Sequence, residues 1–524
     1  MQNHSTTGNG ASLRYGVLAL SAALVLSACG SNAEGGDGDG QGGGTLTFGL
    51  DSDVPSLVTP QNQGSASMML NSVLHRGLVM YDESGEIVPA LAEEFEDEDF
   101  QTYTFHLREG LTFHDGTDLT SEDVKATLEH LADPDTVAKL YPVTQGIESI
   151  ETPDERTVIV HLEEPDAAFL SYLADVSGAI LPSETIGNDG PTYVGAGPFQ
   201  YVSYEEGSAF VVQRFEDYYE DEQPHFDEIE FQVLPDQAAR DNALLTGSAD
   251  MISFVGWTNY AQVEANDGLV LDETMGPFMY LQFNVESDSP FSDPRVRQAV
   301  AYAVDREAVV DSALGGEGAP MYGMPMPEDS EFYNPDLDKW YEQDLDRARE
   351  LLAEAGYPDG FTARMLSSSQ YDFHQNTALS VQNDLEQIGI ELEMNLPDWP
   401  TRLDLGAEGE YDIAVYGTVG TTNDPAWMDQ MLTPAGAQNA PYGYDDETVN
   451  DLLDKGRRAS DLAERQEVYN ELGEYILEEA PVIGLAWRSQ AYGYSTEIEG
   501  FAHIPGFLTF TSGYTLDQAH FTEE

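Results

Sequence analysis

Short apolar β runs alternate with helical segments of ten or more residues through the second half of the chain, and this alternation restricts the possible folds more than any other feature. The runs include residues 279–284, 390–394 and 411–416, and residues 344–355 are one of the helical segments. Strands that alternate with long helices are typical of a sheet that is covered by helices on both faces. The sequence therefore predicts an α/β fold.

Local signals predict where two of these helices begin and end. Asp293 followed by Pro294 supplies an N-cap and a first-turn proline for a helix that runs through Ala303. The helix over residues 344–355 is expected to end at Gly356, because glycine readily adopts the left-handed conformation that closes helices.

Residues 77–189 show a second pattern, in which apolar and polar residues alternate along short strands. The alternation covers residues 103–108 and 158–162. Between these strands, Thr120 and Asp123 have the spacing of a capping box that begins a helix. We expect this part of the chain to form an antiparallel subdomain that is inserted into the main fold.

The charge balance is strongly acidic, with 96 Asp and Glu residues against 21 Lys and Arg residues and a net charge of −75. The acidic residues are spread over all predicted elements, and only four residues are lysines. Self-repulsion of this size is relieved when salt screens it, so the composition indicates a salt-adapted, solvated surface. A nucleic-acid partner is not expected, because the chain has no basic patch that could neutralise phosphates.

Residues 1–28 have the pattern of an export signal, with Arg14 in a polar start and an apolar segment over residues 15–26 that is too short to span a bilayer. Cys29 is the only cysteine and follows Leu-Ser-Ala, which resembles a bacterial lipobox. The resemblance implies cleavage before Cys29 and acylation of its thiol and amine. A free buried cysteine or an ordinary signal with a nearby cleavage site are the alternatives. Residues 29–44 read as a tether rich in Gly and Asp, so we expect a lipid-anchored protein on the outer face of the cytoplasmic membrane.

Signatures of catalysis are absent from the sequence. In a dinucleotide-binding loop, a helix begins directly after the glycines. Here Pro198 follows Gly195 and Gly197, so this stretch is predicted to be a turn before a strand. The ten histidines are scattered singly, without the spacing of metal ligands. We therefore expect no enzyme activity, no cofactor and no metal site.

A set of longer phrases resembles the extracellular solute-binding proteins of family 5, the peptide/nickel-type receptors of ABC importers. The most specific phrase is Tyr-Thr-Phe-His-Leu-Arg-Glu-Gly-Leu-Thr-Phe-His-Asp-Gly-Thr over residues 103–117, followed by residues 120–124. The other phrases occur in the family's order, at residues 89–93, 195–199, 226–229, 243–250, 284, 293–299, 348–357, 411–412 and 480–482. The resemblance covers nearly everything after the tether.

The resemblance implies a bilobal fold of the type II periplasmic-binding-protein kind, with an extra subdomain on the first lobe and a ligand cleft between the lobes. The implied parts are lobe I at residues 45–76, 190–277 and 488–524, the inserted subdomain at residues 77–189, and lobe II at residues 278–487. The chain would then cross between lobes near Gly276 and Trp487. A ligand held by both lobes would stabilise the closed state, which an ABC permease recognises, and a monomer is expected.

The family implies a peptide or a similar polar solute as the ligand. Dipeptide binders pair the peptide amine with an Asp three residues before an acidic-Pro pair; the pair here is Asp424-Pro425, and Thr421 occupies the earlier position. The position of their carboxylate-binding Arg falls near Ser368. A free dipeptide is therefore disfavoured, since an unpaired buried terminus is costly. Longer peptides remain open, as do nickel chelates (with His374 or His503 as ligands), oligosaccharides and opine-type solutes; an exported hydrolase is the remote alternative.

The family also implies which residues face the cleft. The hydroxyl and amide groups of residues 417–424 suit neutral hydrogen-bonding ligands, and Trp rings can stack on sugars or cover apolar groups. Core packing is the alternative for each Trp, and a surface ion pair with Asp398 or Asp404 is the alternative for Arg402. Residues 275–280 and 60–64 are expected to complete the pocket from lobe I. The candidate ligand-binding residues are Trp399, Arg402, Tyr416, Gly417, Thr418, Thr421, Asn423, Asp424, Trp427, Met279 and Tyr280.

Overall fold

The computed structural model describes residues 43–522, apart from residues 55–56, 62–63, 137, 188–189, 286–288, 329, 435, 437–438, 440–441 and 460. The predicted signal, Cys29 and the tether up to residue 42 lie outside the described residues. Within the described part, no helix combines the length and the apolar character that a membrane span requires.

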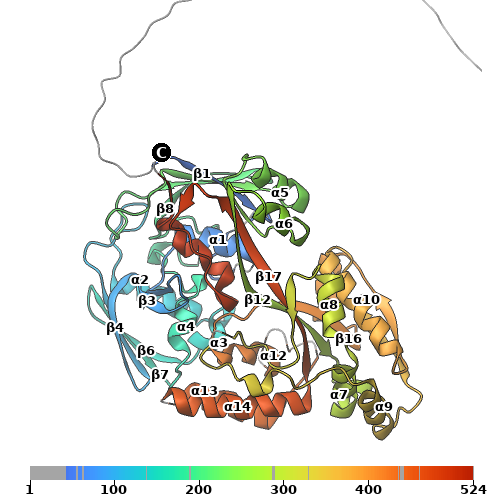
Figure 1. The fold of residues 1–524 in the computed structure, drawn as a ribbon. Coiled ribbons are helices and arrows are strands. Elements are labelled where there is room, and N and C mark those ends of the chain that lie inside the picture. Colours follow the sequence, from blue (N-terminus) through green and yellow to red (C-terminus); the bar gives the residue numbers. More distant parts are fainter. Residues whose placement is uncertain are drawn as a thin grey trace, which may run out of the picture. The chain divides into compact units, whose positions relative to one another are not determined.

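A mixed sheet of eleven strands runs through the described body (Figure 1). Its central strands are antiparallel to their neighbours, whereas β1 pairs in parallel with β10 and β11, and β14 pairs in parallel with β15 and β16. The strand order is β15 (Ile390–Asn395), β14 (Phe361–Leu366), β16 (Ile413–Thr418), β12 (Leu269–Phe283), β17 (Val482–Ser495), β11 (Met251–Ser253), β1 (Thr45–Leu50), β10 (Glu228–Val233), β9 (Ala209–Arg214) and β8 (Phe199–Glu205), with β13 (Gly318–Pro320) paired to β17.

The two longest strands, β12 and β17, cross from one half of this sheet to the other. Toward one end they join β11 and the strands around β1, and toward the other end β12 joins β16. Their pairing slips between Met275 and Phe278, opposite Trp487. A slip of this kind bends a strand locally, so the sheet changes direction at this point.

The inserted segment has its own antiparallel sheet, in the order β4 (Ala92–Glu98), β5 (Thr102–Leu107), β7 (Thr157–Leu162) and β6 (Ile147–Asp154), with a hairpin of β2 (Val79–Tyr81) and β3 (Ile87–Pro89) and helix α2 (Ser121–Leu131). The predicted alternation is confirmed, because Tyr103, Phe105 and Leu107 are buried while their neighbours are half-buried. The predicted capping box of Thr120 and Asp123 is also present. These strands and α2 pack around a hydrophobic core that Ala426, Ile504, Leu508 and Tyr514 complete from outside the inserted segment.

Helices cover the main sheet, and the predicted helix ends are confirmed. Asp293 accepts a hydrogen bond from the Arg295 amide at 2.9 Å and begins α7, and α9 ends just before Gly356, whose φ is 96°. The remaining elements are α1 (Ser65–Leu74), α3 (Tyr141–Thr144), α4 (Phe169–Leu173), α5 (Gln237–Leu245), α6 (Tyr260–Glu264), α7 (Pro294–Ala303), α8 (Arg306–Ala313), α9 (Leu345–Glu354), α10 (Asp372–Glu386), α11 (Trp399–Ala407), η7 (Pro425–Met428), α12 (Asp429–Leu432), α13 (Glu447–Arg458), α14 (Leu462–Glu479), β18 (Ile498–Glu499), η8 (Gly506–Asp517) and β19 (His520–Phe521).

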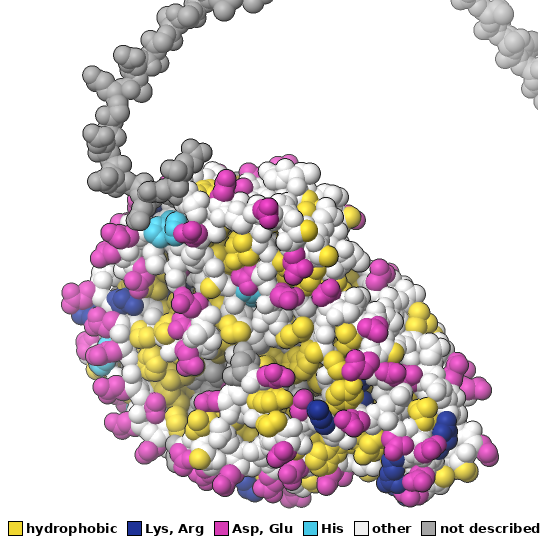
Figure 2. Space-filling view, in the orientation of Figure 1, with side chains coloured by type: hydrophobic (Ala, Val, Ile, Leu, Met, Phe, Trp, Pro, Cys, Tyr) yellow, Lys and Arg dark blue, Asp and Glu magenta, His cyan; other side chains and the backbone are white. Residues whose placement is uncertain are grey.

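Acidic side chains are spread over the surface rather than gathered in one place. Figure 2 shows Asp and Glu across the whole visible face, with few Lys and Arg between them. Strand β4 illustrates the pattern, because most of its acidic residues are exposed while Ala92 is buried. Whether this surface is adapted to salt stays a prediction.

Candidate functional site

A cavity of about 820 Å³ lies between segments from opposite halves of the main sheet. On one side are α1, the inserted segment around α3, and η8; on the other side are the end of β16, α12 with the residues after it, and α13. The lining residues are Gly64, Met68, Pro134, Ala138, Lys139, Tyr141, Pro142, Gln145, Asp175, Thr418, Val419, Gly420, Thr421, Asp429, Gln430, Thr433, Pro434, Gly436, Asn450, Leu453, Asp454, Arg457, Phe507, Leu508, Phe510 and Thr511.

The end of β16 brings hydroxyl groups to the wall of the cavity. Thr418 is the last residue of the strand, and Thr421 follows within the next turn. Gly420 between them lies against the ring of Phe507, where a β-carbon would come within 2.3 Å of a ring atom. Because only glycine fits this contact, the segment can pass close to η8 and place both threonines in the wall. The buried Thr421 hydroxyl has no hydrogen-bond partner among the described residues, so it is available to a bound molecule.

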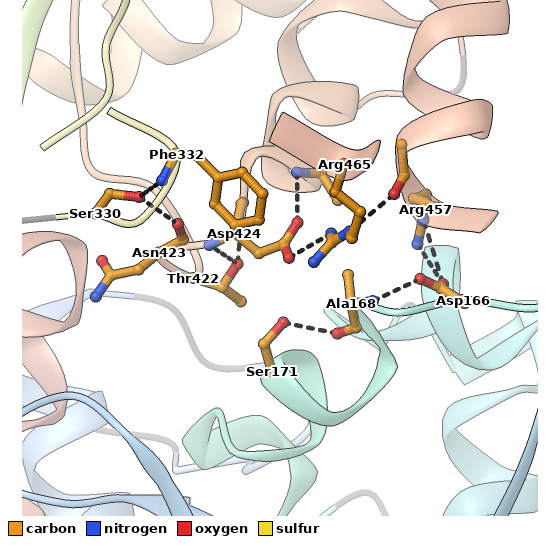
Figure 3. A network of polar contacts seen from close by, with 12 residues as sticks. Asp166, Ala168, Ser171, Ser330, Phe332, Thr422, Asn423, Asp424, Arg457 and Arg465 are labelled. Atoms are coloured by element: carbon orange, nitrogen blue, oxygen red, sulfur yellow. Dashed lines mark hydrogen bonds and ion pairs between the residues drawn. The ribbon is translucent and has the colours of Figure 1, made fainter. Parts of the chain in front are cut away.

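Ion pairs surround the cavity on the side of the inserted segment. Lys139 pairs with Asp175 at 2.9 Å, and Arg457 on α13 pairs with Asp429 at 3.2 Å. Arg457 also pairs with Asp166 of the inserted segment at 3.0 Å (Figure 3). The Ala167 amide also donates to the Arg457 carbonyl at 2.8 Å. Burial raises the pKa of Asp429 to about 6, with Arg457 opposing the rise. Arg457 therefore links the inserted segment to α13 at the edge of the cavity.

Asp424 and Asn423 take part in contacts within the protein. One carboxylate oxygen of Asp424 accepts the Ala426 amide at 2.9 Å, and the other is paired with Arg465 at 2.6 Å (Figure 3). The Asn423 side chain accepts the Phe507 amide at 3.2 Å, across the contact between β16 and η8. Neither residue is among those that line the cavity. Their contacts stabilise the segment that follows the cavity wall.

Three further candidates lie in the hydrophobic core behind the wall. Met279, Tyr280 and Trp427 are between 0% and 2% exposed. The Trp427 ring packs against Phe278 and against Phe507, with ring centroids 5.9 and 5.1 Å apart. These contacts agree with the packing alternative for Trp427, which is not among the residues that line the cavity.

Arg402 is buried, at 2% exposure, so the predicted surface ion pair with Asp398 or Asp404 is wrong. Its guanidinium lies 3.8 Å from the centre of the Tyr416 ring and 5.3 Å from that of Trp399, and it donates to the Val415 carbonyl at 3.0 Å. Helix α11 turns Arg402 inward onto β16. Tyr416 and Trp399 remain partly exposed above it.

Gly417 connects this cluster to the cavity wall. A β-carbon on Gly417 would lie 3.0 Å from the Met279 sulfur and 3.5 Å from His374 Nε2. The residue thus packs inward, between the core and His374, while Thr418 beside it lines the cavity.

The two histidines considered for a nickel chelate are buried in separate places. His503 hydrogen-bonds the Asp272 carbonyl and the Thr509 hydroxyl, and burial lowers its pKa to about 4. His374 is 2% exposed on α10. Over the part of the chain that the structure describes, no group of three or more His, Cys, Asp and Glu residues could hold a metal ion.

Several lining residues were not predicted. Lys139, Asp175 and Arg457 come from the inserted segment and α13, far in sequence from the expected residues 417–424. The sequence gives a weak indication that Lys139 has a specific role, because it is one of only four lysines in an acidic chain. From the expected lobe I segments, Gly64 lines the cavity and Met275 does not, while residues 62–63 lie outside the described residues. Ser368, predicted to replace a carboxylate anchor, is buried and bonded to the Pro397 carbonyl.

Comparison with known proteins places this fold and sequence in one family. The model of bacterial extracellular solute-binding proteins, family 5, matches residues 86–439. The chain belongs to family 5. The predicted resemblance is thereby confirmed.

Relatives of this family 5 protein bind different small molecules. The glutathione-binding protein GsiB of Pectobacterium atrosepticum is 28% identical over 88% of this chain and 90% of its own length. The periplasmic binding protein AgaA of A. tumefaciens R10, solved with agropinic acid, is 39% identical, with a TM-score of 0.84 over 92% of this chain and 99% of that one. DppA from Helicobacter pylori, solved with the peptide STSA, is 24% identical with a TM-score of 0.81 over 92% and 99% of the two chains, which shows a shared fold.

The predicted fold class is confirmed, since the mixed α/β structure matches periplasmic binding proteins with the bilobal type II fold. Solute-binding proteins of family 5 act outside the cytoplasm, bind peptides or other small solutes and work with ABC permeases; the relatives are binding proteins rather than enzymes. This chain is a member of that class of receptor.

Proposed function

We propose that this family 5 protein captures a peptide or a similar polar solute in the cavity and delivers it to the permease of an ABC importer. The observation that carries the proposal is the origin of the cavity wall, which comes from segments on both sides of β12 and β17. A solute that contacts both sides stabilises the closed arrangement over the open one. The cavity volume of about 820 Å³ lies within the range of about 300–1,000 Å³ typical of small-molecule sites.

We assign the two sides of the cavity to two lobes that move about the central strands. Lobe I comprises residues 45–76, 190–277 and 488–524, lobe II comprises residues 278–487, and residues 77–189 are the subdomain on lobe I. Separate hydrophobic cores on either side of β12 and β17 support this division. The slip in pairing near Gly276 and Trp487 supports a hinge at that point.

The lining favours a solute rich in hydrogen-bonding groups. Thr418, Thr421, Thr433, Asn450 and Gln145 present hydroxyl and amide groups, which suit amide or polyhydroxyl ligands. A peptide, a glutathione-like tripeptide and an opine-type solute all meet this requirement, and the 39% identity to the agropinic acid-binding protein favours the opine-type solute as the second candidate.

We further propose that lipid on Cys29 holds the mature protein at the outer face of the cytoplasmic membrane. The support is the sequence pattern of residues 15–29, since an acylated terminus anchors a protein without a membrane span. Replacing Cys29 with Ala is expected to abolish the incorporation of a labelled fatty acid that the wild-type protein shows. Absence of label from the wild-type protein would contradict the anchor.

Native mass spectrometry of the protein purified in molar salt tests the receptor function. We expect the mass of a monomer with one bound small solute, and a smaller radius of gyration by X-ray scattering when that solute is present. Glutathione, agropinic acid and the tetrapeptide Ser-Thr-Ser-Ala serve as added probes if the solute has been lost. The proposal fails if neither a co-purified solute nor any of these probes binds.

A further inference from the structure

The inserted segment contacts the two lobes in different ways. On the lobe I side it shares its hydrophobic core with Ile504, Leu508 and Tyr514. The Tyr514 hydroxyl also donates to the Ala174 carbonyl at 3.2 Å. Among the described residues, lobe II contributes Ala426 alone to that core. Because separating apolar surfaces that share a core is costly, the inserted segment is expected to stay with lobe I when the lobes move.

The contacts with lobe II are mainly polar, and most of them involve Arg457 on α13 (Figure 3). Its Nη2 and Nε lie 3.0 and 3.2 Å from Oδ2 of Asp166 in the inserted segment. The backbone adds a second connection, because the Ala167 amide donates to the Arg457 carbonyl at 2.8 Å. Next to it, Arg458 forms an ion pair with Glu164. We call the contacts of Arg457 with Asp166 and Ala167 the latch.

Two further groups border the latch from opposite sides. Asp429 of lobe II lies 3.2 Å from Nη1 of Arg457, and the Arg457 guanidinium lies 5.9 Å from the centre of the Tyr172 ring in the inserted segment. The buried Oδ1 of Asp429 and the buried Tyr172 hydroxyl have no hydrogen-bond partner among the described residues. Burial and then the Asp429 charge raise the pKa of Tyr172, so its hydroxyl keeps its proton. A small further approach of α12 would let the two groups pair.

The latch lies at the edge of the cavity, where the inserted segment meets α13. Arg457 and Asn450 of α13 line the cavity, and Lys139 and Asp175 of the inserted segment line it from the other side. Because the latch joins these two sides, they move apart only after its contacts break. Release of a solute between them therefore depends on the latch.

Polar contacts of this kind suit a connection that forms and breaks repeatedly. When they separate, water replaces each lost partner, so the net cost is much smaller than that of exposing an apolar core. The side chains of Arg457 and Asp166 are 17% and 16% exposed, so water already reaches the pair. The ion pair of Arg76 and Asp517, both within lobe I, is 0% and 4% exposed and lies away from such a boundary.

We propose that lobe II binds to the inserted segment through the latch when the receptor closes, and that the latch sets how long a solute stays bound. The inference deepens the proposed receptor function and rests on it and on the division into lobes. Arg457 is a positioning residue here, because its charge is paired with carboxylates of the protein and holds the closed arrangement. Without the latch the closed state is populated less, and a bound solute leaves sooner.

Asp166→Asn tests the latch. The Ala168 amide donates to Oδ1 of Asp166 at 3.0 Å, and an Asn oxygen can still accept it, while the charge that holds Arg457 is lost. Asp166 is not among the lining residues, so the variant leaves the cavity wall intact. The matched control is Asp412→Asn, which removes an ion pair of 3.0 Å with Arg364 inside lobe II.

Stopped-flow measurements in molar salt give the dissociation rate of whichever of the co-purified solute, glutathione and agropinic acid binds. We expect D166N to release it at least about threefold faster than the wild type, and D412N to release it at the wild-type rate. X-ray scattering of the solute-free proteins is expected to give a larger radius of gyration for D166N than for the wild type.

A double-mutant cycle isolates the contact, because Arg457 also lines the cavity. If D166N and R457Q remove the same connection, D166N/R457Q is expected to release the solute about as fast as the faster single variant. Effects that multiply in the double variant would show that the two residues act independently, and would overturn the latch.

The outcomes separate the latch from the receptor function. A D166N variant that releases its solute at the wild-type rate overturns the latch and leaves the receptor intact; if its unfolding temperature is also lower, the ion pair has a structural role only. If the wild type binds neither a co-purified solute nor any probe, the receptor function fails. Equal radii of gyration for the solute-free wild type and D166N would then overturn the latch as well.

Discussion

Asp384 on α10 is a buried carboxyl group whose protonation is coupled to folding. The side chain is buried, its Oδ2 accepts the Asp305 amide at 2.9 Å, and burial raises its pKa from 3.8 to about 6. Below a pH of about 3.8 the Asp384 carboxyl group is protonated in both the folded and the unfolded chain. Its contribution to the free energy of unfolding is then fully present. As the pH rises from about 4 to 6, the unfolded chain releases the proton first, and the contribution is lost.

Asp384→Asn is therefore expected to stabilise the protein increasingly between pH 4 and pH 6, by up to about 1–3 kcal/mol above pH 6. The Asn oxygen can still accept the Asp305 amide. Urea unfolding of both proteins across this pH range measures the difference between their free energies of unfolding. The other carboxyl groups titrate in both proteins, so their effects cancel in this difference. A constant difference at all pH values would show that Asp384 does not titrate in this range.

Asp424 was predicted to bind ligand, and its contacts give it a structural task that can be measured separately. Removing its charge leaves Arg465, whose side chain is 8% exposed, with its hydrogen bond to the Gly456 carbonyl but without an anionic partner among the described residues. Asp424→Asn is expected to lower the free energy of unfolding by about 3–5 kcal/mol. The double variant D424N/R465M is expected to lose less, because no unpaired charge remains. Equal losses in the single and double variants would contradict this account.

At the scale of elements, β12 approaches η8 closely near the slip in the sheet pairing. A β-carbon on Gly276 would lie 1.9 Å from the Gly506 carbonyl oxygen, so no side chain fits without moving one of the two segments. The neighbouring Phe278 packs against Trp487 and Phe507, with centroids 5.7 and 6.0 Å apart. A closely packed aromatic group thus lies at the point where the sheet pairing slips.

Gly276→Ala is expected to destabilise the protein by about 1–3 kcal/mol and to weaken solute binding, because η8 also lines the cavity. Gly190→Ala is the matched control, since a β-carbon there meets no atom within 4 Å. Thermal unfolding and calorimetry check both effects. A G276A variant as stable as G190A would show that β12 and η8 can separate at no cost.

At the scale of the whole molecule, we expect the net charge of −75 to make stability depend on salt. The acidic groups are dispersed over the surface seen in Figure 2, so their repulsion acts over many short distances. The screening length falls from about 10 Å at 0.1 M salt to about 3 Å at 1 M, which removes most of this repulsion. Buried ion pairs such as Arg76 with Asp517 are screened much less.

The unfolding temperature is accordingly expected to rise by about 5 °C or more between 0.1 M and 2 M KCl. Differential scanning calorimetry measures the rise, and sucrose of equal osmolality controls for solute exclusion. Equal unfolding temperatures in dilute buffer and in molar salt would exclude salt adaptation.

Local features were predictable from the sequence because the interactions that create them span only a few residues. The capping box of Thr120 and Asp123, the start of α7 at Asp293 and the end of α9 before Gly356 all depend on backbone groups within one turn. The family phrases added the fold class. They also pointed to residues 417–424, of which residues 418–421 line the cavity.

The electrostatic partners of individual side chains were decided only by the tertiary structure. Nothing near Arg402 in the sequence shows that α11 turns it under Tyr416, and nothing near Arg457 shows that it pairs with Asp166, far back along the chain. The sequence by itself determined the elements, the acidic surface and the family, since these follow from composition and short-range pattern. Which of the described charges are paired depends on contacts between distant segments, and these contacts exist only once the chain has folded.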